Sequence, residues 1–307
     1  MRPLVYISVA AALLRASAAW CQEEGNTELE RWIPSFGFEA GLVGGQANGF
    51  LVSNRRPVDD QVAPPGPFPG TPFEGDGNLI DPITLFTGEL MTPGLGSIGG
   101  VDIPGHPRLF AHGDVGIDFS SKVILAKEGS PGELTFPPIS GGGGPSVGGQ
   151  GTETTLQRNM LLARAGLGVA FTTDLFGRRF RVKPSFEYLR ERVQAEGLMK
   201  HALGETIDQV IELHNREEQT LNNVGGGLEL EMDTVRFGPF VLSLFVNGQV
   251  YDLVDEREIN LASPPGSTRA DCTNVASPNP AACWDVKLNS MTYSGAAGIR
   301  FRFFPFE

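Results

Sequence analysis

The sequence has little of what marks several common protein classes. It has none of the long apolar runs of a helical membrane protein, in which each span needs about 20 apolar residues. It has 24 Lys and Arg against 36 Asp and Glu, and this deficit of positive charge disfavours nucleic acid as a partner, since a phosphate backbone requires a clustered basic surface. The glycine-rich stretch 141–151 is not followed by Lys-Ser or Lys-Thr, so neither a phosphate-binding loop nor a cofactor is expected. The chain is instead rich in turn formers, and its 40 glycines and 23 prolines favour an all-β architecture.

Cysteine is also scarce, with three residues in 307. Cys272 and Cys283 flank a polar segment rich in proline and asparagine, and in an exported chain this spacing predicts a disulfide. A metal site would need further ligands nearby, and no histidine flanks the two cysteines. Cys21 is left over and is expected in an N-terminal tail.

Residues that could carry chemistry are few. The four histidines are His106, His112, His201 and His214, and no spacing pairs one of them with a carboxylate or serine in a catalytic pattern. We therefore expect a protein that is not an enzyme, in which His112 pairs with Asp114. Three oxygen-bearing residues in the first long loop, Asp76, Asn78 and Asp81, lack the spacing of a calcium loop, and a solvated loop is the expectation there.

The N-terminus has the layout of a secretory signal peptide. Arg2 precedes the apolar segment Leu4 to Leu14, which is followed by Arg15 and the small residues 16–19. An apolar core of this length between a positive start and an A-x-A end is typical of a cleaved export signal. We assign residues 1–19 to the signal peptide and residues 20–32 to a periplasmic tail.

Period-two alternation of apolar and polar residues predicts eight β-strands. Their ranges are 33–43, 107–119, 122–127, 157–173, 178–194, 219–235, 240–255 and 289–306. Tight turns follow the second, fourth and sixth strands, whereas long loops occupy 44–106, 128–156, 195–218 and 256–288. Segment 195–218 is compatible either with a short amphipathic helix or with an extension of the flanking strands, and its Lys200, His201 and Arg216 could contact lipopolysaccharide phosphates. Short turns at one end, long loops at the other and an even strand number are typical of outer-membrane barrels, here spanning residues 33–306.

The polar faces of these strands are nearly neutral, although the whole chain is acidic. If the strands close into a narrow barrel with the apolar face toward lipid, the polar face is buried and its charges must pair. The sequence therefore predicts an interior network of six basic and seven acidic residues: Glu39, Asp114, Asp118, Arg164, Arg179, Arg181, Lys183, Glu187, Glu229, Glu231, Asp233, Arg300 and Arg302.

The last strand carries a family resemblance. The segment Gly298 to Phe303 resembles the signal by which the barrel-assembly machinery reads the last strand, with Gly298, Phe301 and Phe303 at its signal positions. Together with the layout of turns and loops, the chain resembles the small eight-stranded outer-membrane barrels, the class of the membrane domain of outer-membrane protein A and related porin-like barrels. The resemblance implies a closed, antiparallel, up-and-down transmembrane β-barrel in the outer membrane of a Gram-negative bacterium.

Three functions remain open at this point. The first is a non-catalytic monomer with a plugged lumen, since the interior of an eight-stranded barrel is just wide enough for side chains to fill. Its roles would be envelope structure or surface contact, its partners outer-membrane lipid, lipopolysaccharide and the assembly machinery. The alternatives are a narrow channel or small-solute transporter, and a hydrolase or acyltransferase with its site at the barrel rim.

Overall fold

We analysed a computed structural model of the chain, which describes residues 31–54, 72–98, 101–102, 107–129, 151–159, 161–175, 177–203 and 209–304. The predicted signal peptide, Cys21 and His106 lie outside these residues. The strands are β1 Ile33–Ser53, β2 Phe73–Met91, β3 Ser97–Ile98, β4 Val101–Asp102, β5 Arg108–Asp118, β6 Val123–Gly129, β7 Gly151–Arg158, β8 Leu161–Leu175, β9 Arg178–Leu203, β10 Gln209–Phe237, β11 Phe240–Leu253, β12 Glu258–Ser263 and β13 Ala282–Phe303, and α3 spans Arg269–Thr273. The expectation of an all-β architecture is confirmed. In the part of the chain that the structure describes, no helix is long and apolar enough to cross a membrane.

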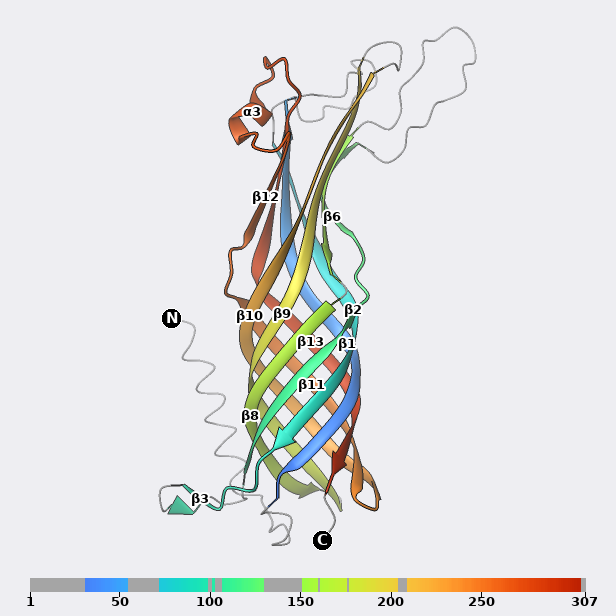
Figure 1. Cartoon of the computed structure of the whole chain (residues 1–307), viewed down its shortest axis with the longest axis vertical. Helices are drawn as coiled ribbons and strands as arrows, with labels where there is room; N and C mark the ends of the chain where they lie inside the picture. Colours follow the sequence, from blue (N-terminus) through green and yellow to red (C-terminus); the bar gives the residue numbers. More distant parts are fainter. Residues whose placement is uncertain are drawn as a thin grey trace, which may run out of the picture.

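Antiparallel pairing closes the main sheet into a ring. The pairs run β1–β2, β2–β5, β5–β8, β8–β9, β9–β10, β10–β11, β11–β13 and β13–β1. The strands of the ring are strongly tilted, with the β8–β9 and β10–β11 turns at its lower end (Figure 1). Because each strand pairs on both sides within the ring, its backbone groups are satisfied without a free edge.

The predicted number of eight strands is wrong for the sheet, which has eleven strands in the described residues. Eight of them form the ring, but they are not the eight predicted: β6, which matches predicted strand 122–127, lies outside the ring, and β2 takes its place. The predicted loop 44–106 is also wrong, because it contains the end of β1 and all of β2. The other three predicted loops contain β7, the extensions of β9 and β10, and β12 with the start of β13. Within segment 195–218, the described residues 195–203 and 209–218 extend the flanking strands β9 and β10 and contain no helix.

Strand β2 shows no period-two alternation near its lower end, because both of its faces carry apolar residues there. Ile83 and Leu85 point inward and are buried, whereas Phe86 and Leu90 point outward and are exposed. Pro82 also argues against a central strand. The structure places Pro82 where β2 loses one neighbour, since pairing with β5 begins only at Ile83.

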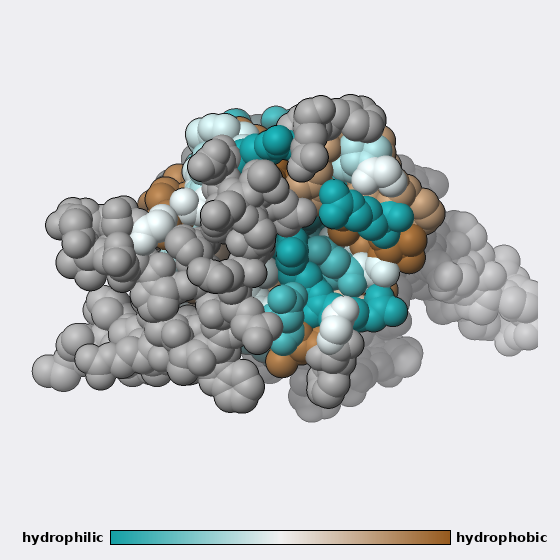
Figure 2. Space-filling view, turned by 90° about the horizontal axis from the view of Figure 1, so that it is seen from below, coloured by the Kyte–Doolittle hydropathy of each residue, from teal (hydrophilic) through white to brown (hydrophobic). Residues whose placement is uncertain are grey.

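The outer surface of the ring carries a continuous apolar band. On β2 the exposed apolar residues extend from Ile80 to Leu90, and on β11 from Phe240 to Val250. Each run covers 11 residues, close to the roughly 9–11 residues with which a tilted strand crosses a bilayer. Viewed from the lower end, hydrophilic residues occupy the centre of the described surface and hydrophobic residues lie toward its edge (Figure 2).

Above the ring, the strands continue into a β-sandwich that we call the head (Figure 1). One sheet has the order β2-β1-β13-β12 and the other β6-β7-β9-β10. The split arises where β5 ends and β6 begins, and where β11 ends and β12 begins. Here the inward side chains are apolar and the outward ones are polar, the reverse of the ring. Trp284, Leu156 and Val286 are completely buried between the sheets.

The two sheets of the head fit closely because of a glycine surface on β1 and β2. Leu125 of β6 lies over Gly49, Gly75 and Gly77, and a side chain at Gly75 would meet the Leu125 carbonyl oxygen. Cross-sheet hydrogen bonds add to this packing: Trp284 Nε1 donates to Thr152 Oγ1 at 3.0 Å. The head therefore has a closely packed apolar core, which lies above the ring.

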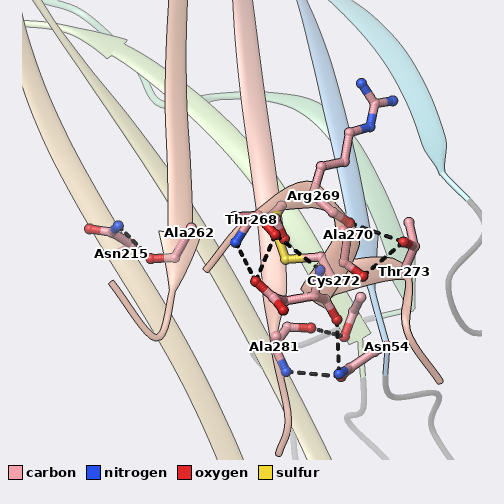
Figure 3. The surroundings of a disulfide bond; sticks show 12 residues. Asn54, Asn215, Ala262, Thr268, Arg269, Ala270, Cys272, Thr273 and Ala281 are labelled. Carbon is pink, nitrogen blue, oxygen red and sulfur yellow. Dashed lines mark hydrogen bonds between the residues drawn. A yellow bond between two sulfur atoms is a disulfide. The ribbon is translucent and has the colours of Figure 1, made fainter. Parts of the chain in front are cut away.

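The disulfide Cys272–Cys283 secures the loop between β12 and β13, with 5.9 Å between its Cα atoms. Asn54, at the end of β1, binds the same loop (Figure 3). Its Nδ2 donates to the carbonyl oxygens of Asp271 and Asn279 at 3.2 and 2.9 Å, and its Oδ1 accepts from the Ala281 amide at 2.9 Å. The connection between β12 and β13 is thus held by a covalent bond and by a buried amide.

Candidate functional site

The inner face of the ring holds a column of charged side chains in three layers. Inward positions on β9 pass through all of them: Arg181 and Lys183 lie in the lower layer, Glu187 in the middle one and Glu191 in the upper one. The next inward residue, Val193, belongs to the apolar core of the head. These four side chains of β9 are buried, so their charges need partners inside the ring.

The lower layer contains four cations and four carboxylates: Arg181, Lys183, Arg300 and Arg302 with Glu89, Glu229, Glu231 and Asp233. Glu231 is its centre, since it accepts from Lys183 Nζ at 3.1 Å, from Arg300 Nη1 at 3.0 Å and from Arg302. Arg300 also pairs with Glu229 and lies over the Phe245 ring. The layer joins β2, β9, β10 and β13.

The middle layer is organised by Arg164 and His112. Arg164 donates to Asp114 at 2.6 Å and also to Glu39. His112 lies between two carboxylates, with Nδ1 3.0 Å from Asp114 and Nε2 3.0 Å from Glu187. With both carboxylates ionised, both ring nitrogens must donate, which describes a positively charged imidazole. The layer then has two cations against three carboxylates.

The upper layer is acidic. Arg158 binds Asp81 at 3.0 Å and Glu191 at 2.8 Å, and its Nη1 also reaches the carbonyl oxygens of Val43 and Leu79. Asp118 is buried beside this group, and neither of its carboxylate oxygens has a hydrogen-bond partner among the described residues. Arg158 thus contacts β1, β2 and β9 at the base of the head.

Most of the predicted network residues come together in these layers, but two do not. Asp118 faces the lumen and forms no ion pair with another residue of the described part. Arg179 lies half-buried at the lower mouth, beyond the lower layer. Sequence reasoning missed Glu89 and Asp81, because β2 was assigned to a loop, and Arg158 and Glu191 of the upper layer. Asp76 and Asn78 point outward on β2 whereas Asp81 points inward, so the three side chains considered for calcium do not converge.

The residues predicted as an assembly signal lie on the closing strand β13. Phe301 stacks on Phe36 of β1 with 5.4 Å between the ring centroids, and Phe303 lies 5.2 Å from Phe240 of β11. Gly298 points inward, where a side chain would meet the Phe245 ring. The two phenylalanines therefore contact the strands on both sides of β13.

The structure describes two histidines with their side chains, His112 and His214, and they lie in different parts of the molecule. His112 is enclosed in the middle layer with both nitrogens engaged. His214 lies on the outside of the head, 3.1 Å from Glu196, which also binds Lys122 at 2.8 Å. Burial raises the pKa of Glu196, but the hydrogen bonds and charges of Lys122 and His214 outweigh it, and the net pKa lies below its ordinary value. No group of three or more His, Cys, Asp or Glu among the described residues is arranged to hold a metal ion.

Comparison with known proteins gives little further guidance. No family model and no curated protein matches the chain. Among solved structures, the outer membrane protease OmpT from Escherichia coli is similar, with 9% identity over 88% of this chain and 97% of that chain and a TM-score of 0.30. A likeness of this size says nothing about the chemistry of this chain.

Proposed function

We propose that the protein is a monomeric, non-catalytic β-barrel of a Gram-negative outer membrane, with a plugged lumen and an outward-projecting head. The observation that carries the proposal is the reversal of side-chain facing between the ring and the head. In the ring, charges point inward and apolar residues outward, an arrangement that suits lipid outside and a filled polar lumen inside. In the head, the apolar residues point inward, which suits water outside.

The contacts inside the lumen support plugging. Three layers of charged side chains, most of them in ion pairs, occupy the ring. Arg158 binds across its top, and the apolar core of the head lies above. Two interior cavities beside Arg158 and beside Arg164 measure about 20 and 10 Å³, which is room for about one water molecule each. A solute would have to break several buried ion pairs to pass.

The head supports a role in surface contact. Its packed core and its secured β12–β13 loop hold the strand ends from which the long connections leave at a fixed place above the apolar band. Under the proposal these connections face the cell exterior, with outer-membrane lipid and lipopolysaccharide around the ring. The barrel-assembly machinery would be a partner only during insertion, and nucleic acid would not be a partner.

Two experiments test the proposal. Reconstituted in planar bilayers, the protein should give no stable, large single-channel steps, because the lumen is filled. A variant with Lys183, Arg300 and Arg302 replaced by alanine serves as a positive control for a weakened plug and should show conductance. Stable large steps from the unaltered protein would contradict the plugged lumen.

The membrane assignment is tested separately. In detergent, the folded protein should show β-rich circular dichroism and should migrate differently on gels before and after heating. A protein that stays soluble and folded without detergent would refute the assignment, whatever the conductance result.

A further inference from the structure

Asp118 is the one carboxylate of the three layers that has no hydrogen-bond or ion-pair partner among the described residues. Its residue is 1% exposed, and neither carboxylate oxygen accepts a hydrogen bond. On β8, one of the two neighbours of β5, the nearest described inward residue is the buried Leu162. The undescribed segments closest to Asp118 in the sequence, residues 130–150 and Met160, contain no basic residue. The carboxyl group therefore lies in an enclosed place without a cation of its own.

The charged groups that act on Asp118 are mostly acidic. They are Asp81 of β2, Arg158 of β7 and Glu191 of β9. Asp118 pairs with Ile83 across β5 and β2, so its side chain lies on the inner face beside Asp81, two residues before Ile83. Asp81 and Glu191 already share Arg158, at 3.0 and 2.8 Å. An ionised Asp118 would place three carboxylates against one guanidinium, and an enclosed carboxyl group in such surroundings keeps its proton.

Asp118 also lies where the chain passes from the ring to the head. It is the last residue of β5, and four residues further on the chain continues in the head as β6. Contacts with the upper layer hold this connection. The Ser121 amide donates to Asp81 Oδ1 at 3.3 Å, and Ser120 Oγ donates to the carbonyl oxygen of Arg158. A negative charge on Asp118 would repel the same carboxylate that holds Ser121.

We propose that Asp118 binds a proton in the folded barrel, and that release of this proton at high pH weakens the junction between the ring and the head. With the proton bound, the upper layer carries one excess negative charge; with the proton released, it carries two. The added repulsion acts on Asp81 and therefore on its contact with Ser121. The connection between β5 and β6 then opens more often as the pH rises. The inference does not depend on a plugged lumen, because it concerns only the upper layer.

Infrared spectroscopy detects the bound proton, because the C=O stretch of a protonated carboxyl group is distinct from the bands of a carboxylate. At about pH 6, where an ordinary aspartate is ionised, Asp118→Asn should lose the intensity of one protonated carboxyl group relative to the unaltered protein. Asp76→Asn is the matched control, since Asp76 is an exposed aspartate of the neighbouring strand β2. This control should keep the full band. Equal bands in the unaltered protein and in Asp118→Asn would overturn the proposal.

Urea unfolding in vesicles measures the coupling to stability. Above about pH 5 the unfolded chain carries Asp118 ionised, whereas the folded protein holds it neutral, so folding takes up one proton. The folding equilibrium constant of the unaltered protein should therefore fall about tenfold per pH unit relative to that of Asp118→Asn, until Asp118 ionises in the folded state as well. Asp76→Asn should follow the unaltered protein. The same pH dependence in the unaltered protein and in Asp118→Asn would contradict proton binding.

Hydrogen exchange tests the effect on the junction. After correction for the intrinsic exchange rate at each pH, the peptide that contains residues 119–122 should exchange faster at about pH 9 than at about pH 6. Asp118→Asn should show no such increase. An equal increase in both proteins, or in neither, would show that Asp118 does not control the connection, and would overturn the junction part of the proposal.

A metal ion is the competing occupant. If Na⁺ or Ca²⁺ at constant ionic strength stabilises the unaltered protein but not Asp118→Asn, a metal ion compensates Asp118 and the proton assignment is wrong. If Asp118→Asn does not fold, Asp118→Leu supplies a second neutral side chain, and failure of both would show that this position needs a charge, which also overturns the proposal. All variants are checked for heat-modifiable migration, so a failure of the barrel assignment is visible separately.

Discussion

The two arginines of the closing strand should differ in their contribution to stability. Arg300 and Arg302 are both almost completely buried, and both lie on β13 in the lower layer. Arg300 pairs with Glu229 and with Glu231 at 3.0 Å, and lies 3.3 Å from Glu89. Without Arg300, Lys183 at 2.7 Å is the one cation among the described residues that Glu229 retains.

Arg302 contributes less than Arg300, because other cations also bind its partner. Its partner Glu231 also binds Lys183 at 3.1 Å and Arg300 at 3.0 Å, and lies 3.7 Å from Arg181. We therefore expect Arg300→Ala to lower the free energy of unfolding by about 3–5 kcal/mol, the usual cost of removing one partner of a buried pair. Arg302→Ala should cost about 1–3 kcal/mol, nearer to the loss of a charged hydrogen bond with its acceptor still satisfied.

The assay is reversible unfolding by urea in phospholipid vesicles, followed by tryptophan fluorescence and by the gel shift of the folded form. The double variant Arg300→Leu/Glu229→Leu is the control, because replacing both members of a buried pair with apolar residues is often close to neutral. It should be more stable than Arg300→Ala alone. If both single alanine variants unfold like the unaltered protein, the inward assignment of the arginines is wrong.

Four further expectations follow from the same structure. Ile299→Arg, on the outward face of β13, should cost about 2–4 kcal/mol in vesicles, and an unchanged urea midpoint would argue against lipid at that face. Trp284→Ala should lower the stability of the head by about 3–5 kcal/mol. We expect faster proteolysis of the head, while the heat-induced gel shift of the ring persists. Loss of that gel shift would show that head and ring do not unfold separately. Asn54→Ala should accelerate proteolytic cleavage within residues 264–281 more than reduction of the disulfide does, because three hydrogen bonds to the loop are lost. Faster cleavage after reduction than in the variant would show that the disulfide is what holds the loop. The pKa of Glu196 is lowered in the folded chain, so the stabilisation from this carboxylate is complete above its ordinary pKa of 4.5 and disappears as the pH falls through the lowered value. Glu196→Gln should therefore remove this part of the acid dependence of the urea midpoint. An acid dependence equal to that of the unaltered protein would contradict the assignment.

The sequence predicted the ring strands whose two faces differ in polarity. On β9, β10 and β13, alternation is clear because one face carries charged residues and the other is apolar, and on β8 and β11 the outward face is consistently apolar. The alternation did not identify β2. Ile83 and Leu85 face inward close to Phe86 and Leu90, which face outward, so apolar residues occur on both faces. It failed again at β6, since a short alternating strand looks the same whether it stays in the ring or leaves it.

The candidate site divides in the same way. The near balance of charges on the polar parity was enough to predict an interior network, and residues such as Arg164, Lys183 and Glu231 could be assigned to it from their strands. Which carboxylate meets which cation could not be predicted, because Glu89, Glu229 and Lys183 come from three strands whose register depends on closure of the whole ring.

The sequence by itself determined the inside and the outside of each regular strand, because a period of two assigns every side chain to one of two faces. It also determined the disulfide, since only two cysteines lie close together in the chain. The tertiary structure alone decided where the apolar face changes sides. Above Arg158 the strands separate into two sheets that pack on each other, and residues that would face lipid or the lumen lower down face a core or water instead. That change depends on which strands pair at each height, and no local pattern contains this information.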